Sequence, residues 1–236
     1  MENKPHNPVF CAIDSADPER AEALAGQLVG SVGGIKLGLE FFGAFGPAGF
    51  RHMARAGVPL FLDLKFHDIP NTVAAAVRAV LPLAPAMLSV HTAGGAAMLR
   101  AARQAIDSAA LAPAPLLLGV TVLTSLGDDD LAALGCSDTT ADQVLRLAAM
   151  AVDCGLDGIV CSPHEIAPLR QRFGDRLKLV VPGIRPSGAG SDDQKRVMTP
   201  PAAMAAGADY LVVGRPITGA PDPAAAARQI VASLKT

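Results

Sequence analysis

Residues 61–72 read Phe-Leu-Asp-Leu-Lys-Phe-His-Asp-Ile-Pro-Asn-Thr and lead from an apolar strand pattern to the start of a helix. On an extended strand, residues two apart face the same side, so we expect Asp63 and Lys65 to point into one space. Leu62 and Leu64 would then face the other way. Burying an acid beside an ammonium costs several kcal/mol per ion unless the two charges neutralise each other or the site uses both. This pair is therefore the first candidate for chemistry.

The strand that ends in this stretch is one of eight short apolar runs rich in Val, Ile and Leu. The expected strands are Pro8–Ile13, Gly34–Leu37, Val58–Leu64, Ala86–Val90, Pro115–Leu123, Gly158–Cys161, Leu177–Val181 and Asp209–Val213. The segments between them have helical spacing at Asp17–Val29, Phe41–Ala56, Asn71–Leu81, Ala96–Ala109, Thr140–Cys154, Pro163–Phe173, Pro200–Ala206 and Pro223–Leu234. Eight strand–helix pairs predict an α/β fold of the (β/α)8 TIM barrel type, with residues 1–236 forming one domain. The alternative is a doubly wound open sheet, which would usually carry a Gly-rich turn after its first strand, and residues 13–17 have none.

Composition excludes several classes of partner. The 20 basic and 22 acidic side chains give no broad field for nucleic acid, and a chain with no Trp and one Tyr offers no aromatic platform for bases. The polar N-terminus does not resemble a secretory signal, and no run of about 18 apolar residues could span a membrane. The four cysteines lack C-x-x-C spacing, which favours reduced, buried thiols in a cytoplasmic protein.

In such barrels the active site lies at the carboxyl ends of the strands, so the polar residues there are the candidates. They are Asp14, Lys36, Asp63, Lys65, Asp68, His91, Thr92, Thr124, Ser125, Ser162, Arg185 and Arg215. Taken singly, Asp14 could cap the next helix, Lys36 could extend its ammonium to solvent, and His91 could be a core histidine. Together, Lys36, Asp63, Lys65 and Asp68 predict an alternating ionic array that keeps a lysine charged inside a pocket.

A second group of residues indicates a phosphate site. Gly214 and Arg215 follow the last strand, where barrels commonly bind phosphate through loop amides and a basic side chain. Arg185 and Gln194 lie in the long segment Pro182–Thr199, whose length inside a barrel is typical of a lid. The alternative is that each arginine only pairs with a surface acid.

At these residues the sequence resembles the orotidine 5′-phosphate decarboxylase family along nearly its whole length. The matching motifs are Ala12-Ile13-Asp14, Ile35-Lys36-Leu37-Gly38, the Asp63–Thr72 stretch, Val90-His91, Val120–Ser125, Val181–Pro186, Asp192–Pro200 and Val213–Ile217. The resemblance implies a homodimer with shared active sites and no metal or organic cofactor. It also implies that Asp68 and Thr72 enter the neighbouring subunit's pocket, that Asp14 and Lys36 hold the ribose hydroxyls, and that Thr124 contacts the pyrimidine. The 5′-phosphate would be held by Arg185, Gln194, Gly214 and Arg215.

The expected reaction is decarboxylation of orotidine 5′-monophosphate to UMP, the last step of de novo pyrimidine nucleotide synthesis. Loss of carbon dioxide from C6 leaves a poorly delocalised carbanion, which Lys65 would stabilise and then protonate, with Asp63, Asp68 and Lys36 completing the catalytic array. Three alternatives stay open: a metal-dependent sugar-phosphate decarboxylase or aldolase of the same barrel group, a nucleotide-binding barrel without turnover, and Lys65 as a Schiff-base former.

Overall fold

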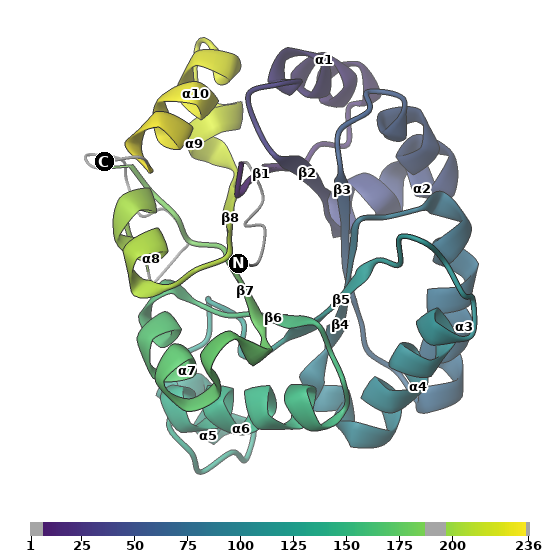
Figure 1. The fold of residues 1–236 in the computed structure, drawn as a ribbon, viewed down its shortest axis with the longest axis vertical. Coiled ribbons are helices and arrows are strands. Elements are labelled where there is room, and N and C mark those ends of the chain that lie inside the picture. The colour runs from purple at the N-terminus through teal and green to yellow at the C-terminus, as the bar shows by residue number, and fades with distance from the viewer. Residues whose placement is uncertain (1–6, 187–196, 235–236) are drawn as a thin grey trace.

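The computed structural model describes residues 7–186 and 197–234. Eight strands lie side by side in chain order, each parallel to the next, and the eighth closes onto the first. Figure 1 shows the helices arranged around these strands. The predicted (β/α)8 barrel is therefore confirmed, including the short second strand, which runs from Gly34 to Leu37 as expected.

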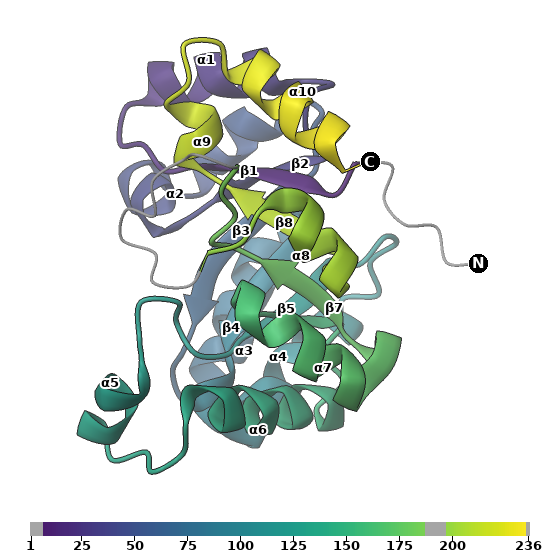
Figure 2. The same cartoon turned by 90° about the vertical axis from the view of Figure 1, so that its left-hand side faces the viewer.

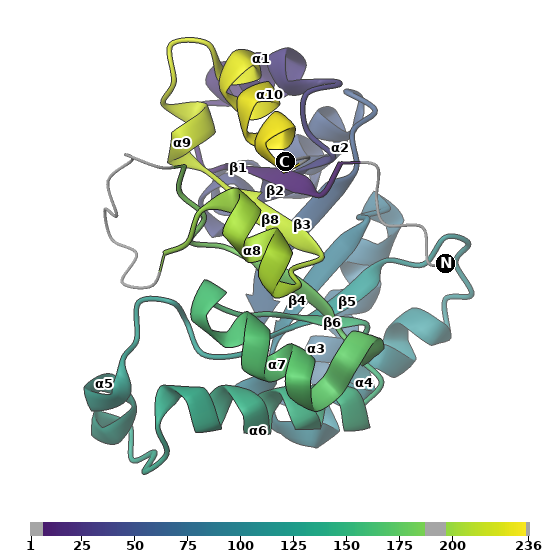
Figure 3. The same cartoon turned by 60° about the vertical axis from the view of Figure 1, so that its left-hand side comes forward.

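The elements follow the predicted order with a few differences in extent. The strands are β1 Val9–Ile13, β2 Gly34–Leu37, β3 Leu60–Phe66, β4 Met87–His91, β5 Leu116–Val120, β6 Gly158–Val160, β7 Lys178–Val181 and β8 Tyr210–Val213. The helices are α1 Pro18–Leu28, α2 Leu39–Ala54, α3 Pro70–Val80, α4 Gly95–Asp107, α5 Asp128–Ala133, α6 Thr140–Asp153, α7 Ile166–Phe173, α8 Pro200–Ala206, α9 Arg215–Thr218 and α10 Pro223–Ser233. The short helices α5 and α9 were not predicted, and β5 ends three residues before the expected Leu123. Figures 2 and 3 show α5 standing away from the barrel wall.

The barrel interior is filled by side chains from alternate positions of the strands. They form a small apolar cluster of Phe10, Ala12, Phe61, Met87, Leu118, Val180 and Val212. Neighbouring strand residues face outward into a larger apolar layer that includes the buried faces of the helices. Phe10 reaches across β2 at Gly34, where any Cβ would collide with its ring, so a glycine at that position makes room for the aromatic side chain.

Helix starts carry the expected capping residues. Asp17 caps α1, because its Oδ1 accepts a hydrogen bond of 3.1 Å from the Arg20 N–H, and Pro18 occupies the first helical position. Capping of α1 therefore does not require Asp14. Within the described ranges, no helix combines the length and apolar character needed to cross a membrane.

Two arginine–aspartate pairs link elements at the amino ends of the strands. Asp157 precedes β6, accepts from the Leu117 N–H at 2.7 Å and pairs with Arg103 of α4 at 2.9 Å. Asp209 precedes β8, accepts from the Leu179 N–H at 2.8 Å and pairs with Arg170 of α7. Each pair ties a strand, the helix before it and the start of the next strand at the end of the barrel away from the candidate site.

Candidate active site

Two adjoining cavities open at the carboxyl ends of the strands, which is where the sequence predicted the site. The first has a volume of about 400 Å³ and is lined by Ala12, Asp14, Lys36, Pro182, Gly183, Arg185, Val212, Gly214, Arg215 and Thr218. The second has a volume of about 220 Å³ and is lined by Lys36, Phe61, Asp63, Lys65, Val120, Val122, Leu123, Thr124, Val160, Cys161, Pro182 and Val212. Lys36, Pro182 and Val212 line both, so the two cavities form one elongated depression.

Four charged side chains of alternating sign lie along this depression. The Lys36 Nζ is 3.3 Å from Asp14 Oδ1 and 3.6 Å from Asp63 Oδ2. The Lys65 Nζ is 2.7 Å from the same Asp63 oxygen. Three members of the predicted alternating array, Lys36, Asp63 and Lys65, are therefore in contact. The fourth acid or base in the row is Asp14, which pairs with Lys36 instead of capping a helix, and not the predicted Asp68.

Asp63 is the centre of the array. Its side chain is buried, and burial alone would raise the pKa of the carboxyl. The positive charges of Lys36 and Lys65, with hydrogen bonds from Lys65 and Ser89, outweigh that cost and hold the pKa of Asp63 below its usual value. The carboxylate is consequently ionised at neutral pH and faces two ammonium groups.

Lys65 has an unusual backbone for a lysine. Its φ is +51°, in the left-handed region, and the pairing of β3 with β4 shifts register between Leu62 and Phe66. A non-glycine residue held in this region costs of order 1–3 kcal/mol and persists only where its surroundings impose it, commonly at functional sites. The prediction that Asp63 and Lys65 share one space is confirmed, but regular strand geometry does not extend through Lys65.

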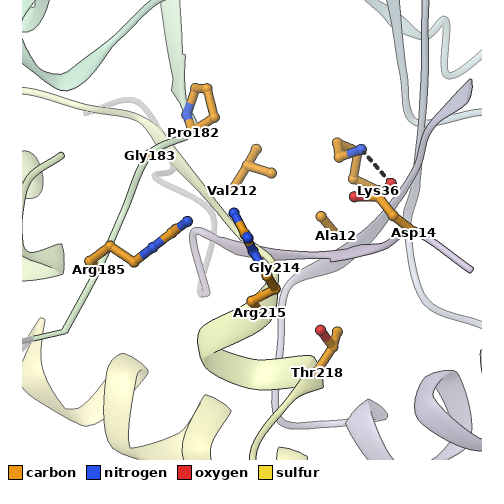
Figure 4. Close-up of a pocket in the computed structure, with 10 residues that line it drawn as sticks. All are labelled: Ala12, Asp14, Lys36, Pro182, Gly183, Arg185, Val212, Gly214, Arg215 and Thr218. Carbon is orange, nitrogen blue, oxygen red and sulfur yellow. Dashed lines mark hydrogen bonds and ion pairs between the residues drawn. The ribbon is translucent and has the colours of Figure 1, made fainter. Parts of the chain in front are cut away.

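The larger cavity carries the two predicted arginines. Figure 4 shows the guanidinium groups of Arg185 and Arg215 pointing into the same space, across from the Lys36–Asp14 pair. Arg185 is buried although it follows β7 in a connecting segment. Gly214 lies between β8 and α9 beside Arg215. Gln194 lies outside the described residues.

The smaller cavity is mostly apolar. Its walls come from β2, β3, β5, β6 and β8 and from the segments that follow β5, β6 and β7. Thr124 lies in the segment between β5 and α5. Asp63 and Lys65 lie at its charged side. A flat, partly apolar ring with one ionised substituent would fit these walls.

Asp68 and Thr72 do not join the array within one chain. Both are exposed at the start of α3, and neither lines the two cavities described above. The Asp68 Oδ1 accepts a hydrogen bond of 2.6 Å from the Ile69 N–H. Their contribution to a neighbouring subunit's pocket stays a prediction.

His91 contacts the segment that follows its own strand and the ring of His67. Its Nδ1 accepts from the Ala93 N–H at 3.2 Å, and its ring stacks on His67 with centroids 5.3 Å apart. Burial, with the charges of His67 and Lys65, lowers the pKa of His91. Within residues 7–186 and 197–234, no group of three His, Cys, Asp or Glu residues is placed to hold a metal ion.

Two residues of the site were missed by sequence reasoning. Ser89 of β4 is fully buried and its Oγ donates to Asp63 Oδ1 at 2.8 Å, whereas the sequence showed only one hydroxyl inside an apolar run. Gly38 follows β2, and a Cβ there would lie 2.8 Å from Lys36 Nζ and 3.0 Å from Asp14 Oδ1. The only available signals were a polar residue in a buried strand and a glycine two positions after a candidate lysine.

Comparisons with known proteins agree with this geometry. The model of the orotidine 5′-phosphate decarboxylase / HUMPS family matches residues 7–230. A Rhodospirillum rubrum protein named orotidine 5′-phosphate decarboxylase is 57% identical over 238 aligned residues, which cover 99% of this chain and 96% of that protein. The protein of the same name from Paramagnetospirillum magneticum is 53% identical over 232 residues, covering 97% of this chain and 98% of that protein.

A solved structure supports the same assignment. The crystal structure of orotidine 5′-phosphate decarboxylase from Lactobacillus acidophilus superposes with a TM-score of 0.83 at 36% identity, covering 98% of this chain and 100% of that one. Both the sequence and the barrel thus match proteins of one family over nearly their full lengths. The chain belongs to the orotidine 5′-phosphate decarboxylase family.

Proposed function

We propose that Lys65 is the stabilising charge and general acid in the decarboxylation of orotidine 5′-monophosphate to UMP, the reaction of the family to which the chain belongs. The observation that carries the proposal is the position of the Lys65 Nζ, which lies beside a cavity for the pyrimidine and 2.7 Å from the ionised Asp63 carboxylate. This ion pair holds the Lys65 side chain at the edge of that cavity.

The bond changes balance with Lys65 as the only proton donor. The bond between C6 of the ring and the substrate carboxyl carbon breaks, carbon dioxide leaves, and the electron pair stays on C6. The Lys65 ammonium attracts this carbanion and transfers a proton to it, which gives UMP and a neutral amine that solvent reprotonates. Two unit charges 4 Å apart interact by about 4 kcal/mol at an effective dielectric near 20, so other contributions must add to this one.

Asp63 has two roles in this proposal. It holds the Lys65 ammonium in place, and its negative charge beside the substrate carboxylate raises the energy of the ground state relative to the carbanion. Lys36, bound to both Asp14 and Asp63, links this reacting end to the rest of the depression. Lys36 and Asp14 are therefore suited to hold the ribose hydroxyls between the two cavities.

The larger cavity is suited to the 5′-phosphate. Arg185 and Arg215 supply two guanidinium groups, which match a phosphate dianion in charge and geometry, and Gly214 supplies backbone next to Arg215. Gln194 would join them from the Pro182–Thr199 segment. The two ends of that segment are hydrogen-bonded to each other, Arg185 N to Met198 O at 3.0 Å and Met198 N to Gly183 O at 3.3 Å. The phosphate lies far from C6, so its binding would favour closure of the Pro182–Thr199 segment over the site without any contact to the reacting atoms.

We further propose a homodimer in which each chain completes its partner's site. The rim of the barrel mouth exposes apolar side chains, among them Leu39 at 61% and Ile69 at 67%. Ile69 lies between Asp68 and Thr72, so a second chain that covered it would also contact these two polar residues. Exposed apolar side chains that lie beside polar residues with no role in their own chain's cavities are typical of an interface.

A cytoplasmic location and a reaction without a cofactor complete the proposal. The four cysteines are free thiols, three of them buried, which suits a reducing compartment. The charges that the mechanism needs all come from Asp63, Lys65 and Lys36.

The decisive variant is Lys65→Ala. We expect kcat to fall by about 10³-fold or more, because both the charge and the proton donor are lost. The measurement is the absorbance change as purified protein meets orotidine 5′-monophosphate, with circular dichroism to confirm folding. Lys178→Ala is the matched control, since Lys178 begins β7 at the opposite end of the barrel. A Lys65→Ala protein with near wild-type turnover would rule out the assignment.

The same assay separates the alternatives. With a chelator present, activity on orotidine 5′-monophosphate is expected to persist, whereas a metal-dependent sugar-phosphate enzyme would lose its activity. A barrel that only binds nucleotide would show no absorbance change with any amount of protein. Schiff-base formation needs a neutral Lys65 amine, which the ion pair with Asp63 opposes, and borohydride trapping of a substrate adduct would reveal it.

A further inference from the structure

We propose that Ser89 is a positioning residue for the reaction: its hydroxyl fixes the Asp63 carboxylate and the Lys65 backbone together and so sets where the Lys65 ammonium lies. The inference rests on the proposed function, in which Lys65 acts on the substrate. Ser89 lies within β4, is fully buried and lines neither cavity. Any effect it has on the reaction must therefore pass through the residues that it contacts.

Three hydrogen bonds close a ring through Ser89. The Lys65 N–H donates to Ser89 Oγ at 2.9 Å, Ser89 Oγ donates to Asp63 Oδ1 at 2.8 Å, and Lys65 Nζ donates to Asp63 Oδ2 at 2.7 Å. The directions are fixed, because a backbone N–H can only donate and an ionised carboxylate can only accept. The ring thus joins the backbone of Lys65 to the partner of its own side chain.

The Ser89 hydroxyl contacts β3 where its pairing with β4 is irregular. Between Leu62 and Phe66 the register of β3 against β4 shifts, and Lys65 has a left-handed φ of +51° within this interval. Its N–H donates to the Ser89 side chain of β4. Since a lysine leaves this conformation unless its surroundings hold it there, the Ser89 contact helps to maintain the backbone from which the ammonium projects.

If Ser89 only supplied a partner for the buried Lys65 N–H, it would not need to contact Asp63. Its second hydrogen bond, to the Asp63 carboxylate, therefore supports a positioning role. Asp63 Oδ1 is held by Ser89, while Oδ2 faces Lys65 at 2.7 Å and Lys36 at 3.6 Å. A carboxylate held at one oxygen has a fixed plane, so the other oxygen has a fixed position between the two lysines. Without the hydroxyl, the carboxylate can rotate and the lysines can follow it.

The test compares two substitutions of Ser89 with a matched control. We expect Ser89→Ala to lower kcat about 10- to 100-fold while KM changes less than about threefold, because the array is disturbed but the cavity walls are not. Ser89→Thr keeps a hydroxyl and is expected to recover most of the lost turnover. Thr92→Val removes another fully buried hydroxyl, which donates to Val120 O at 2.6 Å and contacts no member of the array, and should retain wild-type kcat.

Two further readouts exclude a general loss of structure. The affinity for UMP, measured by calorimetry, should be the same in Ser89→Ala and wild type, and the melting temperatures of the Ser89→Ala and Thr92→Val proteins should be similar. The Ser89 bond favours the ionised form of Asp63, so its loss raises the pKa of that carboxyl and moves the acid limb of the kcat profile to higher pH.

The outcomes separate the two levels of inference. A wild-type protein that does not decarboxylate orotidine 5′-monophosphate contradicts the proposed function itself. If the wild type is active and Ser89→Ala turns over equally fast, only the role of Ser89 is wrong. Equal losses in Ser89→Ala and Thr92→Val, or a Ser89→Thr protein no better than Ser89→Ala, would also overturn that role.

Discussion

Gly38 is the residue that leaves room for the array. It follows β2 directly, and the space that a side chain would occupy there is taken by the Lys36 ammonium and an oxygen of Asp14. Its backbone angles, φ −99° and ψ −164°, are accessible to any residue, so the backbone does not require glycine. The need for glycine at this position therefore arises from the ion pair.

Gly38→Ala adds one methyl group and tests whether the Lys36–Asp14 ion pair needs this space. The Lys36 ammonium is the end of a flexible chain and can move aside, so we expect folding to be retained. The displaced ammonium would lose its contacts with Asp14 and Asp63, and kcat/KM should fall by about 10-fold or more. Steady-state kinetics and a thermal melt measure the two effects separately.

The control for Gly38→Ala is Gly26→Ala. Gly26 is exposed in α1 and a Cβ there would meet no atom within 4 Å, so the substitution should leave activity unchanged and raise stability by about 0.5–1 kcal/mol through helix propensity. Wild-type kcat/KM in Gly38→Ala would show that Lys36 does not need its observed position.

Helix α7 is linked to the amino ends of the strands through the side chain of Arg170. Besides its ion pair with Asp209, this side chain donates to the carbonyls of Gly207, Gly174 and Leu177, each at 2.8 Å. Asp209 in turn accepts from the Leu179 N–H of β7. Both charged side chains are largely buried, so removal of the guanidinium would leave several polar groups without their partner.

Arg170→Ala is expected to lower the free energy of unfolding by about 2–4 kcal/mol, because a mostly buried ion pair and three further hydrogen bonds are lost. Denaturant unfolding measures this change. Specific activity at a temperature where the variant is folded should match wild type, since Arg170 lies at the end of the barrel opposite the site. The exposed Arg172 in the same helix is the control, and Arg172→Ala should cost less than about 1 kcal/mol. Equal effects of the two substitutions would contradict this linking role of Arg170.

The strands could be predicted from the sequence, but the irregular pairing of β3 with β4 could not. Alternation of apolar residues and helical spacing are local, so all eight strands were predicted, including β2. The shift between β3 and β4 is not local, because it depends on how two strands pair, and neither the left-handed Lys65 nor its bond to Ser89 had a distinct signal. Asp14 was ambiguous for a related reason: a carboxylate after a strand can cap a helix or pair with a lysine, and only the position of Lys36 decides.

A single chain brings most of the predicted site residues together in the barrel mouth, but leaves two of them outside the cavities. Asp14, Lys36, Asp63, Lys65, Thr124, Arg185, Gly214 and Arg215 line the joined cavities. Asp68 and Thr72 lie on the exposed rim. The proposed shared site would account for both placements, because residues that face away from their own cavity can face a partner's.

Mixing two inactive variants tests the shared site. If the Lys65 of one chain works with the Asp68 of its partner, Lys65→Ala and Asp68→Ala homodimers should each be nearly inactive. In a mixed dimer, one site combines both substitutions and the other has neither, so random exchange of subunits should restore about one quarter of wild-type activity per chain. The measurement is turnover after mixing at concentrations that allow exchange, with light scattering to confirm dimers. Arg172→Ala mixed with Lys65→Ala provides the control, since activity should then equal the share of intact Lys65 chains. If Asp68 acts only within its own chain, the first mixture stays inactive, because every site then retains one of the two substitutions.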